Sequence, residues 1–181
     1  MKITLTPAAK EDLRHVKPLY LSAFPREERA PFSRIKRTAM RKRGTLLIAR
    51  DGEEFIGFLY LIEQGTLIYL FYLAIAESKR GSGYGGEVLE AVKELYRGKR
   101  LFLAREELDP TSDNYEQRLR RHEFDLRHGF EDQPLKIKEG PVVYDVMGIG
   151  DPATPEEYRA LMLSWGGRLL PLLVDIRLFR A

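Results

Sequence analysis

The chain of 181 residues contains no cysteine, so disulfide bonds, thiolate zinc sites and a cysteine nucleophile are excluded. It also lacks a long apolar run. The longest, residues 67–76, has the length of a strand and falls short of the roughly 20 residues that cross a bilayer. Residues 1–5 lead into a charged segment and do not form the apolar core of a signal peptide. We therefore expect a cytoplasmic protein with no membrane partner.

The composition, with 44% hydrophobic and 31% charged residues, indicates a folded globular protein. A chain of this length can bury a core of its own. The net charge is +3, and much of the basic excess lies in residues 34–43. This cluster could face nucleic acid, an acidic substrate or a coenzyme phosphate, or it could be a solvated helix face. Because no aromatic residue alternates with the basic ones, we expect no nucleic-acid partner.

Hydrophobic periodicity and turn residues predict strands and helices in mixed order. The predicted strands cover residues 2–5, 45–50, 55–63, 67–75, 101–104, 135–138 and 142–147. The predicted helices cover residues 7–23, 32–43, 86–97, 113–128 and 155–165. Thr6 should cap the first helix, Pro18 should kink or divide it, and Gly44 should end the second. The prolines around residues 24–31 indicate a loop. The expected fold class is α+β, a mixed, mostly antiparallel central sheet flanked by helices.

The residue pattern changes near residue 150, where a predicted strand gives way to a proline-containing polar stretch. Residues 151–155 are typical of a linker, so we expect one domain over residues 1–150 and a C-terminal helical extension over residues 151–181. The end of this extension is rich in apolar side chains, namely Leu169, Leu170, Leu172, Leu173, Val174, Ile176, Leu178 and Phe179. These side chains would pack against the domain or form a homodimer contact.

A glycine cluster follows the strand at residues 67–75, and two binding motifs fit it. Gly81, Gly83 and Gly86 satisfy the dinucleotide fingerprint G-x-G-x-x-G, with an acidic pair at residues 106–107 at the distance of a ribose-binding acid. In a dinucleotide site, however, the strand leads almost directly into the first glycine and belongs to a parallel sheet. Here a polar stretch intervenes and the strand belongs to a predicted antiparallel meander, which argues against this interpretation.

The second motif is Arg-x-x-Gly-x-Gly, formed by Arg80, Gly83 and Gly85. Small residues let consecutive backbone N–H groups converge, and the start of the following helix adds a partial positive charge. Such a site suits a pyrophosphate, to which Arg80 would add a permanent cation. Through this motif and the strand before it, residues 73–85, the chain resembles the GCN5-related N-acetyltransferase (GNAT) family. The resemblance extends over about residues 1–150.

The resemblance implies the acyl-CoA N-acyltransferase fold and a transferase activity. The enzyme would be an acetyltransferase that moves an acetyl group directly from acetyl-CoA to a primary amine of a small-molecule or peptide acceptor. Coenzyme A would be carried in by the co-substrate, and no metal is expected. In the family, the strands that correspond to residues 67–75 and 101–104 splay apart and the pantetheine arm inserts between them. The implied coenzyme-binding residues are Leu73, Ala74, Ile75, Arg80, Gly81, Ser82, Gly83, Tyr84, Gly85 and Asn114.

Catalytic groups depart from the family pattern. Family members often carry a tyrosine acid after the phenylalanine of the last helix, where this chain has Asp125, and an ordinary aspartate is ionised at neutral pH. Asp125 and Glu106 are the catalytic candidates. Further carboxylates that could act as a base or bind a cationic acceptor are Glu27, Glu28, Glu63 and Glu107. The missing tyrosine motivates one alternative, a degenerate acyl-CoA-binding protein that acts as a sensor or scaffold.

Overall fold

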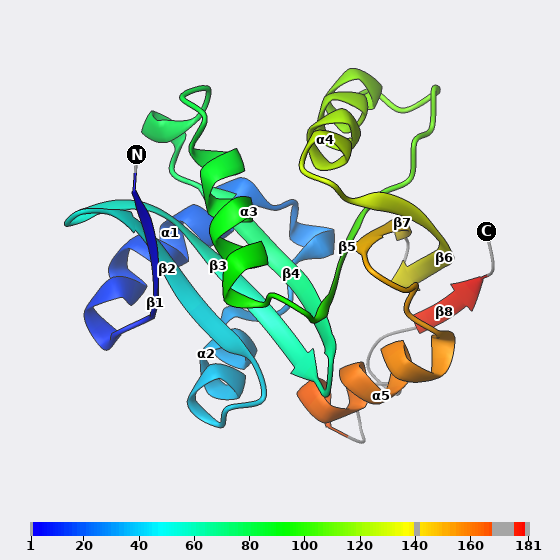
Figure 1. Ribbon diagram of the computed structural model, residues 1–181, viewed down its shortest axis with the longest axis horizontal. Helices are drawn as coiled ribbons and strands as arrows, with labels where there is room; N and C mark the ends of the chain where they lie inside the picture. Colours follow the sequence, from blue (N-terminus) through cyan, green and yellow to red (C-terminus); the bar gives the residue numbers. More distant parts are fainter. Residues whose placement is uncertain (1, 140–141, 168–175, 180–181) are drawn as a thin grey trace. The chain divides into compact units, whose positions relative to one another are not determined.

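The computed structural model describes residues 2–139, 142–167 and 176–179 (Figure 1). The chain divides into two compact units. Unit 1 consists of Met1–Glu63 and Leu70–Arg97, and unit 2 consists of Gln64–Tyr69 and Gly98–Ala181. Strand β4 (Leu67–Ile75) therefore contributes residues to both units.

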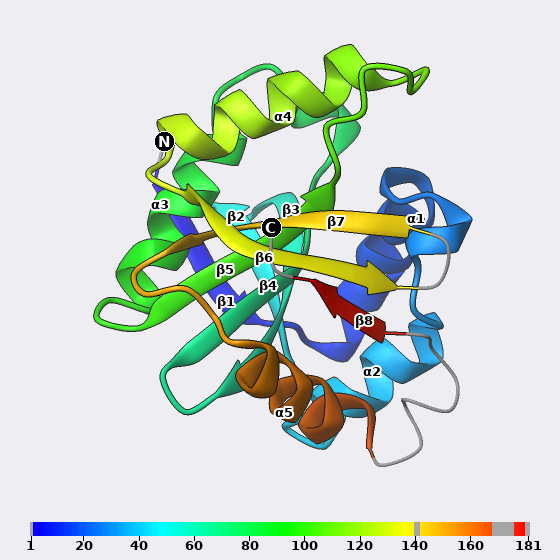
Figure 2. The same cartoon turned by 90° about the vertical axis from the view of Figure 1, so that its right-hand side faces the viewer.

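Unit 1 contains strands β1 (Ile3–Pro7), β2 (Thr45–Asp51) and β3 (Glu54–Gln64), which lie in this order before β4. β2 pairs antiparallel with both β1 and β3. The helices of the unit are α1 (Leu13–Ala23), α2 (Phe32–Met40) and α3 (Tyr84–Leu95), with 3₁₀ helices at Lys10–Asp12, Arg26–Glu28 and Glu77–Lys79. Figure 2 shows α3 on one side of the strands, and α1 and α2 on the other.

Strand β3 forms the centre of the unit 1 core. Its apolar side chains from Ile56 to Ile62 are all at most 1% exposed, on both faces of the strand. A strand covered by helices on both faces reads as a continuous apolar run rather than an alternating one, as this segment does. Each fully buried side chain of this size contributes about 1.5–3 kcal/mol to folding.

Unit 2 contains strands in the order β4–β5–β7–β6–β8, with β5 (Arg100–Glu106), β6 (Glu131–Glu139), β7 (Val142–Ile149) and β8 (Ile176–Phe179). Leu67–Tyr69 of β4 pairs parallel with β5, and the other pairs in the unit are antiparallel. Helices α4 (Tyr115–Arg127) and α5 (Pro155–Gly166) lie on opposite faces of these strands (Figure 2). The predicted fold class, a mixed and mostly antiparallel sheet flanked by helices, is confirmed.

The start of the first helix differs from the prediction. β1 continues through Thr6 and Pro7 and pairs them with β2, so Thr6 does not cap a helix. α1 begins at Leu13 instead, after a 3₁₀ turn in which the Asp12 carboxylate accepts from the N–H of Ala9 at 2.9 Å. Pro18 lies inside α1 without dividing it. A proline there removes one N–H donor, which a helix held by side-chain packing on one face can tolerate.

The end of α2 also differs from the prediction. The left-handed residue that closes the helix is Lys42, at φ 54°, and not Gly44. The N–H of Arg43 donates to the carbonyl of Thr38 at 2.9 Å, and the N–H of Lys42 donates to Ala39 at 3.1 Å, which is the Schellman pattern. Gly44 is needed for a different reason, because a Cβ there would lie 2.0 Å from the hydroxyl oxygen of Tyr60.

The stretch predicted as a helical extension contains both a helix and a strand. Helix α5 begins with a capping box, in which Thr154 and Glu157 satisfy each other's backbone N–H groups. Strand β8 pairs antiparallel with β6. Of the apolar tail considered as a dimer contact, residues 168–175 lie outside the described residues. The predicted domain boundary at residue 150 stays a prediction.

Gly57 permits the close passage of β3 and β4 in unit 1. A Cβ on this residue would lie 2.2 Å from the carbonyl oxygen of Ala74, and a backbone atom cannot move aside as a flexible side chain can. We expect Gly57→Ala to lower the free energy of unfolding by about 1–3 kcal/mol in urea titrations. Gly65→Asn is the matched control, since Gly65 has φ 60° with nothing within 4 Å, and asparagine accepts that conformation. Equal stability of the two variants would contradict the close passage.

Candidate functional site

The loop between β4 and α3 brings together most of the residues expected to bind the coenzyme. Gly81 and Gly83 have φ angles of 76° and 82°, in the left-handed region that favours glycine. Gly83 is the N-cap of α3, and no side chain in the described part of the chain caps this helix. The helix starts at Tyr84, two residues before the predicted start, so Tyr84 and Gly85 form its first turn.

Five consecutive backbone N–H groups, from Gly81 to Gly85, donate to no acceptor among residues 2–139, 142–167 and 176–179. The first bonds of the helix come later, from Gly86 and Glu87 to the carbonyl of Gly83 at 3.1 and 3.3 Å. The positive end of the helix dipole lies at the same place. Converging N–H groups at a helix start form a site for an anion such as a pyrophosphate.

Arg80 supplies a cation beside these N–H groups. Its Nε donates to the carbonyl oxygen of Ile75 at 3.1 Å, which fixes the side chain at the end of β4. The residue is exposed, and its guanidinium pairs with no carboxylate of the described residues. The neighbouring Lys79 is already paired with Glu54, at 2.5 Å. Arg80 is therefore the charge in this segment that remains available to an anionic ligand.

The backbone of β4 has a fixed orientation near the loop. The N–H of Ala76 donates to the carbonyl of Ile56 at 2.8 Å, so this residue directs its backbone groups toward β3. Because backbone groups alternate in direction along a strand, those of Leu73 and Ile75 face away from β3. The bond from Arg80 to the Ile75 carbonyl agrees with this direction. Leu73 and Ile75, two of the expected coenzyme-binding residues, thus have backbone groups that β3 does not use.

Tyr84 contributes its backbone N–H to the loop, while its side chain bonds to β2. Its hydroxyl donates to Oδ2 of Asp51 at the end of β2, at 3.1 Å, and this bond raises the pKa of the tyrosine. Asp51 also accepts from the N–H of Lys2 at 3.3 Å. The tyrosine side chain therefore anchors the loop to the ends of β1 and β2.

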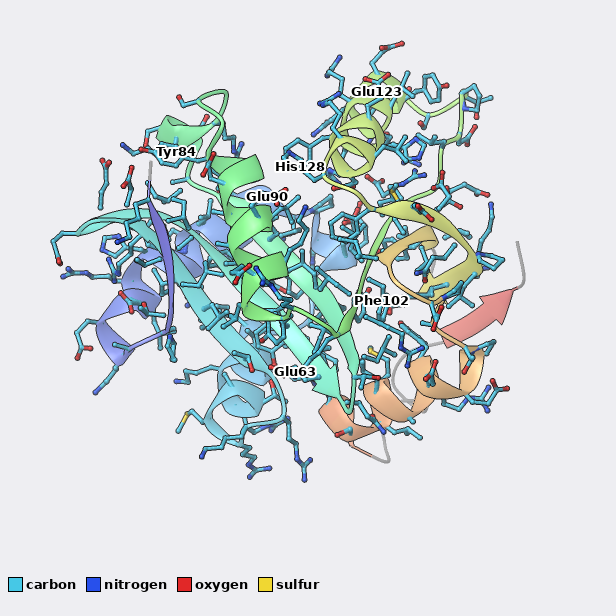
Figure 3. All side chains as sticks on the ribbon, viewed as in Figure 1. Glu63, Tyr84, Glu90, Phe102, Glu123 and His128 are labelled. Atoms are coloured by element: carbon cyan, nitrogen blue, oxygen red, sulfur yellow. The ribbon has the colours of Figure 1, made fainter. Side chains whose placement is uncertain are left out.

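Glu63, a candidate base, lies at the other end of unit 1 from Tyr84 (Figure 3). Its Oε1 accepts from the hydroxyls of Thr45 at 2.9 Å and Tyr96 at 2.8 Å. Tyr96 follows α3, a helix of 12 residues that spans about 18 Å from the glycine loop. Burial raises the pKa of Tyr96, and the hydrogen bond to Glu63 raises it further. Through these contacts, Glu63 of β3 links β2 to the end of α3.

Glu106 and Asn114 are brought together in unit 2 by Arg118. The guanidinium of Arg118 lies 2.8 Å from Oε1 of Glu106, and its Nε donates to Oδ1 of Asn114 at 2.7 Å. Asn114 is the N-cap residue of α4, but its side chain bonds to Arg118 and Glu106 rather than to the helix backbone. The neighbouring Glu107 pairs with Lys136. A base at Glu106 would have to share its carboxylate with a permanent cation.

Asp125 is buried in α4, with 5% of its surface exposed. Burial raises the pKa of its carboxyl from 3.8 to about 6, although the positive charges of Arg121, Arg105, His122 and His128 act in the opposite direction. A group with this pKa is still mostly ionised at pH 7.5, and its burial limits contact with a substrate. Its catalytic role stays a prediction.

Sequence reasoning missed Tyr72, which fixes the loop that carries Glu27 and Glu28. The Tyr72 hydroxyl donates to the carbonyl of Glu28 at 3.0 Å and accepts from the N–H of Ala30 at 2.9 Å. The hydroxyl of Tyr20 donates to the carbonyl of Ala30 at 2.7 Å. Burial raises the pKa of Tyr20 to about 12. The sequence offers no motif for the Tyr72 bonds, because the partners are separated by more than 40 residues and the loop is held through its backbone atoms.

No helix of the described residues combines the length and the apolar character that a membrane crossing requires. Nor do three or more histidine, aspartate or glutamate side chains among them gather where a metal ion could be held.

Comparisons with known proteins agree with this geometry. The sequence model of the acetyltransferase (GNAT) family matches residues 12–120. A GNAT acetyltransferase from Bacteroides thetaiotaomicron has a similar structure, with a TM-score of 0.69, 20% identity, and coverage of 93% of this chain and 97% of that one. An aminoglycoside 6'-N-acetyltransferase complexed with coenzyme A has a TM-score of 0.59 and 16% identity, with coverage of 83% of this chain and 99% of that one. The ribosomal-protein-S18-alanine N-acetyltransferase of Escherichia coli has a TM-score of 0.58 and 14% identity, with coverage of 85% of this chain and 97% of that one. No curated protein sequence matches the chain.

The family match over residues 12–120 covers more than half of the chain. The chain belongs to the acetyltransferase (GNAT) family. It is an acetyl-CoA-dependent N-acetyltransferase, which confirms the enzyme class and the co-substrate expected from the sequence.

The raised pKa of Asp125 predicts a pH-dependent stability. Folding disfavours the ionised form, so Asp125 weakens the fold as the pH rises from about 4 through about 6. We expect Asp125→Asn to gain stability relative to the wild type over this range, by up to about 3 kcal/mol at pH 8. Urea titrations at pH 4 to 8 measure the difference.

Asp113→Asn, at an exposed aspartate just before the same helix, is the control and should not reproduce this gain in stability. A parallel pair of profiles for wild type and Asp125→Asn would rule out the burial effect.

Proposed function

We propose that residues 80–85 bind the pyrophosphate of acetyl-CoA and that the enzyme transfers the acetyl group directly to a primary amine. This proposal rests on the run of five N–H groups at the start of α3 that have no acceptor among the described residues. The guanidinium of Arg80 would pair with the phosphates and the N–H groups would bond to their oxygens. Tyr84 contributes its N–H while its hydroxyl holds the loop to Asp51.

Leu73 and Ile75 would bond to the pantetheine arm, because their backbone groups face away from β3. One N–H in this stretch would polarise the acetyl carbonyl and stabilise the negative charge that develops on its oxygen. Bound acetyl-CoA supplies the activated acetyl thioester. Ala74 would support the site indirectly. Its carbonyl lies against Gly57, so that β4 passes close to β3.

The acceptor amine must lose a proton before or during the transfer. We propose that the loop held by Tyr72 borders the acceptor and that Glu27 or Glu28 attracts its ammonium group. Glu106 and Asp125 were the first candidates for proton transfer. Their surroundings favour structural roles, since Glu106 is paired with Arg118 and Asp125 is buried. On this proposal, the thiolate leaves without help from Asp125.

The acceptor is an amine of a small molecule or a peptide. The structural relatives named above include one enzyme for an aminoglycoside and one for an alanine of a ribosomal protein. At 14% and 16% identity they share the fold with this chain, so both acceptor classes are proposed. A cytoplasmic location, an acetyltransferase domain over residues 1–150 and a homodimer contact through the tail remain part of the proposal.

The pyrophosphate contact can be tested with two ligands that differ in that group. We expect Arg80→Gln to weaken coenzyme A binding about 10- to 100-fold, because a charge-assisted hydrogen bond contributes about 1.5–3 kcal/mol. Calorimetry with S-acetylpantetheine, which has no pyrophosphate, should give the same affinity for variant and wild type. Arg97→Gln is the control, at an exposed arginine beyond the far end of α3. Loss of S-acetylpantetheine affinity in Arg80→Gln would point to a general distortion instead.

Measurement of turnover distinguishes an active acetyltransferase from a scaffold that only binds the coenzyme. We expect release of free thiol from acetyl-CoA with at least one amine in a panel of polyamines, aminoglycosides and peptides with free N-termini. Tyr72→Phe should raise the KM for that amine more than the KM for acetyl-CoA, because it removes both bonds to the acceptor loop. Tight coenzyme A binding with no thiol release across the panel would support the scaffold.

A further inference from the structure

A cavity of about 730 Å³ opens in unit 1, where β2 begins. Its walls come from the end of β1, the start of α1, the end of α2 and the first residues of β2. The glycine loop lies at the other end of β2, where Asp51 bonds to Tyr84. Seven strand residues separate the two ends, a distance of about 20 Å. The cavity is therefore separate from the proposed pyrophosphate site.

The floor of this cavity is apolar. It includes Leu13, Ala39, Met40 and Leu46, together with the segment Pro7–Ala9. Met40 is 78% exposed, an unusual position for a large apolar side chain beside a recess. A recess of this volume with apolar walls has the size and character of small-molecule binding sites.

The charged side chains around the cavity all carry a positive charge. Its twelve lining residues include Lys10, Lys36 and Lys42 and no aspartate or glutamate. All three lysines are exposed, and in the described part of the chain none of them forms an ion pair. Three ammonium groups around an apolar recess complement a ligand that carries an anionic head on an apolar body.

The backbone of Lys42 has an unusual conformation. Lys42 is the one residue other than glycine with a positive φ among the described residues, at 54°. Glycine would close α2 at this position with less strain, so the lysine is held there at a cost. Unfavourable conformations of this kind concentrate at binding sites, where the side chain serves a purpose that glycine cannot. Here the backbone directs Lys42 to the wall of the cavity.

We propose that this cavity binds a small anionic amphiphile, an apolar chain that ends in a carboxylate. The chain lies on the apolar floor between α2 and β2, and the carboxylate lies among Lys10, Lys36 and Lys42. Burial of the chain removes apolar surface from water, while the head group stays at the mouth, where it keeps part of its hydration. The site is independent of acetyl-CoA and of the transfer reaction.

Octanoate is the test ligand and octylammonium its control, since the two share an apolar chain and differ in the sign of the charge. Titrations followed by heteronuclear NMR, with coenzyme A present in excess, keep the fatty chain out of the coenzyme site. We expect octanoate to shift resonances of α2 and of the first residues of β2, and octylammonium to leave them unchanged. Equal shifts with both ligands would overturn the proposed selectivity for an anion.

Variants locate the site. Lys10→Gln combined with Lys36→Gln should weaken octanoate binding about tenfold, at about threefold for each exposed charge. Lys17→Gln, an exposed lysine of α1 outside the cavity, is the matched control and should bind as the wild type does. Ala39→Phe should block binding by filling the recess, and all these variants should retain wild-type affinity for coenzyme A. Octanoate binding that survives both the double variant and Ala39→Phe would refute the proposal.

Discussion

A backbone N–H group without a protein acceptor is tolerated only where water or a ligand can reach it. Residues 81–85 present five consecutive N–H groups with no acceptor in the described part of the chain. Their arrangement depends on left-handed glycines and on four contacts that hold the loop in place. Ala76 bonds to β3, Lys79 pairs with Glu54, Arg80 bonds to the end of β4, and Tyr84 bonds to Asp51. The ends of β2, β3 and β4 thus support a loop whose own donors stay free for a ligand.

Much of this site could be predicted from the sequence, because glycine spacing and the strand before it are local signals. The fold class followed from the same kind of local pattern. The unpredicted features depend on contacts between distant residues. Pairing with β2 carries β1 through Pro7, and pairing with β6 makes a strand of residues that followed a predicted helix. The sequence predicts Gly44 as the end of α2, whereas the left-handed residue that closes the helix is Lys42. Sequence alone does not reveal that Gly44 is needed because Tyr60 fills the space beside it.

The carboxylates that were candidates for acid–base chemistry show why residue type alone is a weak guide to role. Glu63 bonds to Thr45 and Tyr96, and Glu106 pairs with Arg118. The carboxyl of Asp125 is buried instead, and burial raises its pKa. Partners and exposure, both set by tertiary structure, decide which carboxylate can exchange protons with a substrate.

Tyr72 holds the loop proposed to border the acceptor through backbone atoms of that loop, the carbonyl of Glu28 and the N–H of Ala30. Tyr20 does the same through the carbonyl of Ala30. Neither attachment depends on which side chains the loop carries. Substitutions at residues 26 and 27 can therefore change the surface beside the proposed acceptor without releasing the loop, so that a new acceptor preference can evolve on an unchanged scaffold.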